Sequence, residues 1–283
     1  MTDHPNARLL IGPAELQKLD RVQVIDTRPA ERFAAGRIPG AIHLELWGLS
    51  LNDTDPAPMR AFLWTISHYL TTRGIDPKPP VAVYEDSETG IRAARAFWFL
   101  EYFGHPDVRV LDGGFQAWKG AGLPIETGEA KTAPKGTWPD DGSTGRREDT
   151  LAGWRDVFAG AGAPGHRHDL AILDTRSEQE YRGTLKRASR AGAIPNAIHV
   201  EWRDNLDATG RFKSAADLRR LYEAKGITPD RDVISYCQGG YRAAHGYLAL
   251  RLLGYPRVRN YVASWAEWGN REELPVEQVK GQR

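Results

Sequence analysis

The sequence contains a single cysteine, Cys237, among its 283 residues. One thiol cannot form an intramolecular disulfide, which excludes a secreted domain held together by disulfides, and it cannot build a zinc site from several cysteines. Out of context, a lone cysteine is more often a small buried hydrophobic residue than a reactive group. The residues around Cys237 therefore decide whether it is functional.

Long hydrophobic runs and an excess of either charge are also missing. No segment approaches the roughly eighteen apolar residues that span a bilayer, and the N-terminal residues lack the apolar core of a signal peptide. Lys and Arg total 38 against 37 Asp and Glu, so the formal net charge is only +1. These absences predict a cytoplasmic protein with no nucleic-acid or membrane partner, in which any functional positive charge is local.

What the sequence does contain is an internal repeat. Five short segments of the first half recur in the same order in the second half, at offsets of 148 to 156 residues. The pairs are 24–28 with 172–176, 38–43 with 194–199, 92–94 with 242–244, 103–106 with 253–256 and 123–126 with 274–277. A period this long indicates duplication of a whole domain rather than a solenoid. We therefore predict one domain over residues 8–127, a linker over 128–150 and a second domain over 151–283.

Each copy has the pattern of an α/β domain. Short apolar runs at 81–84 and 233–236 are typical of buried parallel strands, and each precedes a helical stretch, at 93–103 or 242–253. Another short apolar run follows each helix, which completes a βαβ unit. We predict two tandem α/β domains, each with a parallel-sheet core flanked by helices. Ligands bind at the carboxyl ends of such strands, and Cys237 lies at one of them.

Cys237 opens a loop that favours an anion. The adjacent Gly239 and Gly240 permit backbone conformations closed to other residues, and a helix begins near Arg242. Inward-pointing amides, the positive end of the helix and the Arg242 guanidinium all favour a thiolate over a thiol. A structural cysteine needs none of these features, so we predict that Cys237 is catalytic. The residues of this loop expected to bind the substrate are Gln238, Gly239, Gly240, Tyr241 and Arg242.

These motifs together resemble the tandem rhodanese family, which includes thiosulfate and 3-mercaptopyruvate sulfurtransferases. The resemblance rests on the cysteine loop, the two Asp-x-Arg strand ends, the Ile-Pro-(Gly/Asn)-Ala-Ile-His repeats and the run Ser264–Asn270, and it extends from about Leu9 to Glu277. It implies that only the second domain is catalytic, and that the first forms the other wall of the active-site cleft. The first domain agrees, because Glu85 stands at the cysteine position in a loop two residues longer, and a carboxylate cannot carry sulfur.

The chemistry implied by the resemblance is transfer of sulfur from thiosulfate to cyanide or a thiol through a Cys237 persulfide, without a metal or a cofactor. Thiosulfate is favoured because its two negative charges suit Arg242 and the loop amides. Two alternatives stay open: 3-mercaptopyruvate as the donor, although Gln238 and Gly239 depart from the Cys-Gly-(Ser/Ala)-Gly loop typical for it, and a persulfide carrier or binding module without small-molecule turnover. A cysteine phosphatase is disfavoured, since its loop has five residues between cysteine and arginine and this one has four.

Three further residues are candidates for the site. Asp174 and Arg176 lie at a strand end, where they are expected to brace the loop or to contact the donor, with a purely structural ion pair as an equal alternative. The resemblance suggests that Arg182 helps to bind an anionic donor, although a solvated surface arginine is the simpler interpretation.

The remaining aromatic and histidine residues are expected to be structural. His245, three residues beyond Arg242, is expected on the helix surface. Trp265 and Trp268 are expected in the core or the cleft wall, and Trp138, inside the linker, is expected to pack onto a domain surface.

Overall fold

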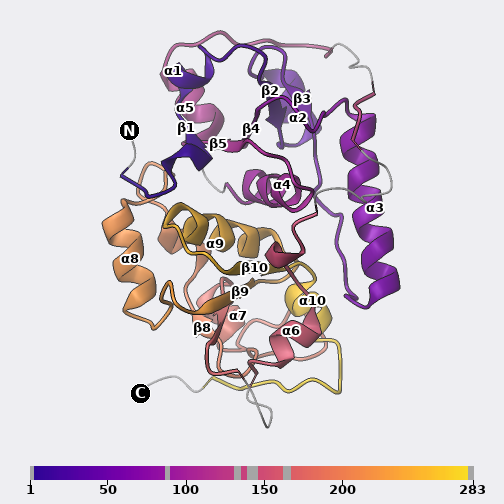
Figure 1. Cartoon of the computed structure of the whole chain (residues 1–283), viewed down its shortest axis with the longest axis vertical. Helices are drawn as coiled ribbons and strands as arrows, with labels where there is room; N and C mark the ends of the chain where they lie inside the picture. The colour runs from indigo at the N-terminus through magenta and orange to yellow at the C-terminus, as the bar shows by residue number, and fades with distance from the viewer. Residues whose placement is uncertain (1–2, 87–89, 131–134, 139–145, 162–166, 280–283) are drawn as a thin grey trace.

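The computed structural model describes residues 3–86, 90–130, 135–138, 146–161 and 167–279, and Figure 1 shows them as two α/β units, one above the other. Residues 87–89, which belong to the longer loop predicted for the first domain, lie outside this described part. So do residues 131–134 and 139–145 of the predicted linker.

Each unit contains one five-stranded sheet, and every strand pair in both sheets is parallel. The strand orders are β1-β5-β4-β2-β3 and β6-β10-β9-β7-β8, so the second sheet repeats the first strand for strand. The first sheet contains β1 (Leu10–Ile11), β2 (Gln23–Asp26), β3 (Ile42–His43), β4 (Val81–Tyr84) and β5 (Val108–Leu111). The second contains β6 (Leu151–Ala152), β7 (Leu170–Asp174), β8 (Ile198–His199), β9 (Asp232–Tyr236) and β10 (Val258–Tyr261). The predicted fold class and the repeat are confirmed.

Helices flank both sheets. In the first half they are η1 (Ala7–Leu9), α1 (Pro13–Leu16), α2 (Ala30–Ala35), α3 (Pro56–Thr72), α4 (Ile91–Tyr102) and α5 (Gly114–Gly120). In the second half they are η2 (Glu148–Thr150), α6 (Trp154–Phe158), α7 (Glu178–Tyr181), η3 (Trp202–Asn205), α8 (Ala215–Glu223), α9 (Tyr241–Leu252) and α10 (Ser264–Trp268). None of the helices in the described ranges is long and apolar enough to cross a membrane.

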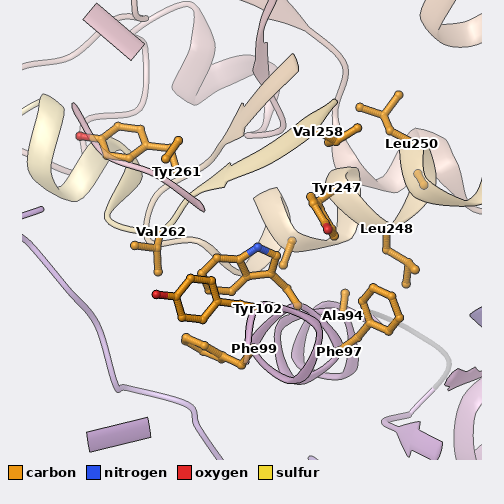
Figure 2. Close-up of a cluster of buried hydrophobic side chains, with 14 of the residues drawn as sticks. Ala94, Phe97, Phe99, Tyr102, Tyr247, Leu248, Leu250, Val258, Tyr261 and Val262 are labelled. Atoms are coloured by element: carbon orange, nitrogen blue, oxygen red, sulfur yellow. The ribbon is translucent and has the colours of Figure 1, made fainter. Parts of the chain in front are cut away.

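The two halves share a hydrophobic core along the helices α4 and α9, which lie side by side at the centre of Figure 1. Figure 2 shows Phe97 of α4 near Leu248 of α9, within a buried cluster that also contains Phe99 of α4 and Val258 of β10. Both helices are buried over most of their length. Because α4 follows β4 and α9 follows β9, this packing sets the two equivalent loops against the opposite domain.

The burial of individual side chains corrects one expectation and supports two others. His245 was expected on the helix surface, but it is buried, because the face of α9 that carries it packs on the first domain. Trp265 and Trp268 are buried in the core, as expected. Trp138 is buried too, stacked on His105 of the first domain.

Candidate active site

Cys237 follows directly after β9, the middle strand of the second sheet. Its backbone is held from the far side of the loop: the N–H donates to Oγ of Ser264 at 3.0 Å, and the carbonyl accepts from the N–H of Trp265 at 3.0 Å. Oγ of Ser264 in turn donates to the carbonyl of Tyr261 at 2.6 Å. The start of the Ser264–Asn270 run thus serves as the anchor that fixes where the cysteine leaves its strand.

The turn after the cysteine directs an amide at the sulfur. The N–H of Gly240 donates to Sγ of Cys237 at 3.1 Å, and Gly240 caps α9 with a φ of 85°. A Cβ atom at this position would lie 2.5 Å from the carbonyl oxygen of Val262. Only glycine adopts this conformation and fits this space without strain, which gives a structural reason for the second glycine of the loop.

The sulfur is almost completely buried. A sulfur carrier has to be reached by its donor, yet Cys237 is only 1% exposed. The first domain contacts the same loop, since the hydroxyl of Tyr241 donates to the carbonyl of Leu46 at 2.5 Å across the domain boundary. Gln238 and Gly239 remain half-buried at the rim of the loop. The sulfur accepts a hydrogen bond from the backbone of this loop, which purely apolar packing would not supply.

Arg242 is engaged by a carboxylate that the sequence analysis did not single out. Its guanidinium donates to both carboxylate oxygens of Glu180, at 2.5 and 2.9 Å. Glu180 also accepts from Ser177 in a capping box at the start of α7, and this Ser-x-x-Glu pattern is the signal that could have identified it. Although burial acts against it, these bonds lower the pKa of Glu180 to about 2. The charge of Arg242 is thus largely neutralised before any donor arrives.

This ion pair predicts a pH-dependent contribution to stability. The folded-state pKa of Glu180, about 2, lies below the ordinary value of 4.5, so the stabilisation is present above about pH 5 and is lost as the pH falls towards 2. Glu180→Gln is therefore expected to lower the free energy of unfolding near pH 7 by at most about 3 kcal/mol. Urea unfolding of both proteins over a pH series checks this: the difference should narrow on acidification, and a constant gap would contradict it.

Asp174 and Arg176 form a buried bidentate pair, with 2.6 Å between Nη2 and Oδ2. The guanidinium also donates to the carbonyl of Gly192 at 2.9 Å. Asp26 and Arg28 repeat this arrangement in the first domain, again at 2.6 Å. The hydroxyl of Tyr236, the residue before the cysteine, donates to Asp174. Of the two predicted roles, the geometry favours bracing of the loop over contact with a donor.

Of the two interpretations of Arg182, its placement favours a surface arginine. Arg182 forms an exposed ion pair with Glu178 at 2.7 Å, and in the described part of the chain no hydrogen bond or ion pair joins it to the cysteine loop. Its expected role in binding an anionic donor therefore lacks support from this placement. Arg187, which no sequence signal singled out, does reach the loop: its carbonyl accepts from Nε2 of Gln238 at 3.1 Å, and its Nε lies 3.5 Å from Glu180.

In the first domain, Glu85 takes the place of the cysteine. Its carbonyl accepts from the N–H of Phe115 at 2.8 Å, as that of Cys237 does from Trp265. Its carboxylate accepts from the N–H of Arg92, the second residue of α4, at 2.7 Å. The cavity beside Glu85 measures about 30 Å³, which is room for a water molecule or two and not for a thiosulfate ion. The Glu85 side chain thus accepts a hydrogen bond from the start of α4, as Sγ of Cys237 accepts one from the residue that caps α9.

Comparison with known proteins agrees with this architecture. The profile of the rhodanese-like domain matches residues 13–121 and 162–271, one match in each half. A protein of Thermus thermophilus named sulfur carrier protein TtuD is 38% identical over 259 residues, covering 86% of each chain. A thiosulfate sulfurtransferase of Azotobacter vinelandii is 33% identical over 281 residues, covering 98% of this chain and all of the relative. That of Pseudomonas aeruginosa is 34% identical and covers 95% of this chain and 97% of the relative.

Solved structures agree on the fold. The wild-type structure of EanB superposes with a TM-score of 0.82 at 22% identity, and covers 99% of this chain and 72% of that one. At this level of identity the likeness extends to the fold alone. Taken with the two domain matches and the full-length relatives, it leads to one conclusion: this chain belongs to the rhodanese family and carries two rhodanese-like domains in tandem.

Proposed function

We propose that this chain is a sulfurtransferase that moves the outer sulfur of thiosulfate to a thiophilic acceptor, either cyanide or a thiol, through a persulfide on Cys237. The observation that carries the proposal is the hydrogen bond from the N–H of Gly240 to Sγ of Cys237, at the end of the central strand of the second domain. Amide donors of this kind stabilise a sulfur anion. Relatives named thiosulfate sulfurtransferase, similar over nearly the whole chain, support it.

The reaction proceeds in two half-reactions. In the first, the Cys237 thiolate attacks the outer sulfur of thiosulfate; a sulfur–sulfur bond to Cys237 forms, the one within thiosulfate breaks, and sulfite leaves with the electron pair. In the second, cyanide or a thiolate attacks the outer sulfur of the persulfide and leaves with it, while the electron pair of the broken bond returns to Cys237. No proton has to be supplied in the cyanide reaction. The kinetics are therefore ping-pong.

The residues of the loop divide the work. The peptide between Gly239 and Gly240 supplies the N–H that reaches the sulfur, and Tyr241 attaches the loop to the first domain. Gln238 lies at the rim together with Arg187, whose exposed guanidinium adds positive charge where an anionic donor approaches. Arg242 keeps Glu180 and the start of α9 in place.

The first domain does not carry sulfur in this proposal, because Glu85 occupies its cysteine position. Its role is to cover and shape the site through the segment that contains Leu46 and through α4. Cys237 is nearly buried, and the half-buried Gln238 and Gly239 are the loop residues nearest to it through which this proposal brings in the donor.

A second candidate function comes from the relative named sulfur carrier protein, at 38% identity. In that case the persulfide would be passed to or from a partner protein, with slow turnover of small molecules. A third, 3-mercaptopyruvate sulfurtransferase, shares the same cysteine chemistry. That reaction releases the enolate of pyruvate, which has to take up a proton. The loop after Cys237 contains no serine that could relay one.

A donor panel decides between these functions. Wild type and Cys237→Ala are incubated with cyanide and either thiosulfate or 3-mercaptopyruvate, and sulfite, pyruvate and thiocyanate are measured. We expect thiocyanate and sulfite from thiosulfate at a rate well above that from 3-mercaptopyruvate. Faster pyruvate release would favour the mercaptopyruvate enzyme. A persulfide that forms in a single turnover, with no sustained turnover of either donor, would favour the carrier.

A further inference from the structure

The loop that carries Cys237 receives a charged side chain from the other domain. Arg95, in the middle of α4, is only 1% exposed. Its Nη1 donates to the carbonyl oxygen of Gly239, and its Nη2 donates to that of Leu49 at 2.8 Å. Its guanidinium also stacks on Tyr241, with 3.8 Å from Cζ to the ring centroid. Arg95 therefore contacts both the backbone and a side chain of the cysteine loop.

The charge of Arg95 is not balanced by a carboxylate. Within the ranges that the structure describes, its hydrogen bonds go to carbonyl oxygens, and its Nε has no partner. By contrast, Glu180 neutralises Arg242 and Asp174 neutralises Arg176. Burial lowers the pKa of Arg95, while the nearby Tyr241 and Cys237 act in the opposite direction. A buried, unpaired cation is costly, so its retention beside a sulfur nucleophile indicates that the sulfur anion is its counter-charge.

The path from Arg95 to the sulfur runs through a single peptide group. The carbonyl of Gly239 and the N–H of Gly240 belong to one trans peptide, so they point in opposite directions. Arg95 holds the oxygen end, and the N–H at the other end donates to Sγ of Cys237 at 3.1 Å. A charged donor on the oxygen polarises the peptide and strengthens its N–H as a donor to sulfur.

The internal repeat provides a comparison inside the same molecule. At the position equivalent to Arg95, the second domain has His245, and the two residues face opposite loops. Ring atoms of His245 lie 3.6 Å from where a Cβ of Gly90 would be, as Nη1 of Arg95 lies 3.2 Å from the corresponding point of Gly240. Burial lowers the pKa of His245 to about 3, so it is neutral at pH 7. The loop with the cysteine thus receives a cation, and the loop with Glu85 receives a neutral ring.

We propose that Arg95 is a positioning residue for sulfur transfer, which orients and polarises the Gly239–Gly240 peptide so that its N–H stabilises the thiolate and the persulfide of Cys237. The inference rests on the function proposed above, which supplies the persulfide. It assigns the first domain a direct electrostatic part in the reaction of the second.

The test is the pH profile of Cys237 alkylation by iodoacetamide in the full-length chain, in which the reagent meets only one thiol. Arg95→Met is expected to move the midpoint to higher pH by about one unit, and to slow alkylation near pH 7 roughly five- to tenfold. Arg95→Lys keeps the charge but cannot bridge two carbonyls in the same way, so a smaller shift is expected. The rate of persulfide formation from thiosulfate should fall in the same order.

Arg37→Met is the matched control. Arg37 is also buried in the first domain, where it donates to the carbonyl of Gly128 at 2.7 Å and pairs with Glu126 at 2.5 Å. This variant should lose stability and keep the wild-type alkylation profile. An equal shift in both variants would overturn the proposal, since general destabilisation would then explain it.

Two further results are decisive. If Arg95→Met folds and keeps the wild-type alkylation profile, the proposal is overturned. If only Arg95→Lys folds, a wild-type alkylation profile in that variant overturns it instead. Alkylation needs no sulfur donor, so the outcome is separate from that of the proposed function. A wild-type chain that is alkylated normally but takes sulfur from no donor would contradict the function, whatever the Arg95 variants show.

Discussion

Replacing Cys237 with serine is expected to abolish sulfur transfer, with a fall in rate of at least about a thousandfold, because the hydroxyl is a poor nucleophile for sulfur and cannot hold a persulfide. The chain has no other cysteine that could substitute for it. Mass spectrometry of the intact protein after incubation with thiosulfate should show one added sulfur atom in the wild type and none in Cys237→Ser. Thiocyanate formation from thiosulfate and cyanide measures the rate.

Glu85→Gln is the control for this prediction, because Glu85 occupies the same position in the other domain. An amide oxygen still accepts the hydrogen bond from the N–H of Arg92, so the variant should fold and should transfer sulfur close to the wild-type rate. Added sulfur in Cys237→Ser would show that another residue carries sulfur. Loss of turnover in Glu85→Gln with a normal melting temperature would show that Glu85 takes part in the transfer.

Replacing Gly240 with alanine is expected to have the second largest effect. With a φ of 85°, an L-residue at this position costs roughly 1–3 kcal/mol in backbone strain alone. The added Cβ would also lie 2.5 Å from the carbonyl oxygen of Val262, so the backbone has to shift. This shift removes the N–H of Gly240 from Sγ of Cys237. We expect a lower free energy of unfolding by urea, and a loss of activity per folded molecule of at least about a hundredfold.

Gly239→Ala is a matched control one residue away. An added Cβ there would lie 3.8 Å from Oγ of Ser50, an ordinary contact, and Gly239 does not have a positive φ. Its free energy of unfolding should stay within about 0.5 kcal/mol of the wild type. If Gly240→Ala were as stable and as active as Gly239→Ala, the amide contact to the sulfur would not matter for the reaction.

The duplicated architecture explains how the first domain contacts the cysteine loop of the second. The packing of α4 against α9 forms a core that both domains share (Figures 1 and 2). Each helix then presents a side chain to the opposite loop, Arg95 in one direction and His245 in the other. A first domain without a cysteine can therefore still influence the chemistry of the second. Its removal is expected to take away the contact of Arg95 with the cysteine loop as well as exposing that loop.

The sequence by itself determined the features that local patterns record. The duplication follows from five ordered repeats, the parallel sheets from short apolar runs, and the place of Cys237 from a strand that ends in a Gly-Gly turn before a helix. These patterns are legible because strand burial, turns and helix starts depend on neighbours within a few residues.

Only the tertiary structure decided which charges meet, and which surfaces are buried. The pairing of Glu180 with Arg242 spans 62 residues, and the bond from Arg95 to Gly239 spans 144. Cys237 and His245 are likewise buried in the folded chain, although neither burial is apparent from the neighbouring sequence. Such contacts leave no local pattern, because the free energy of an ion pair or a buried cation depends on the distance and the surroundings that the folded chain imposes.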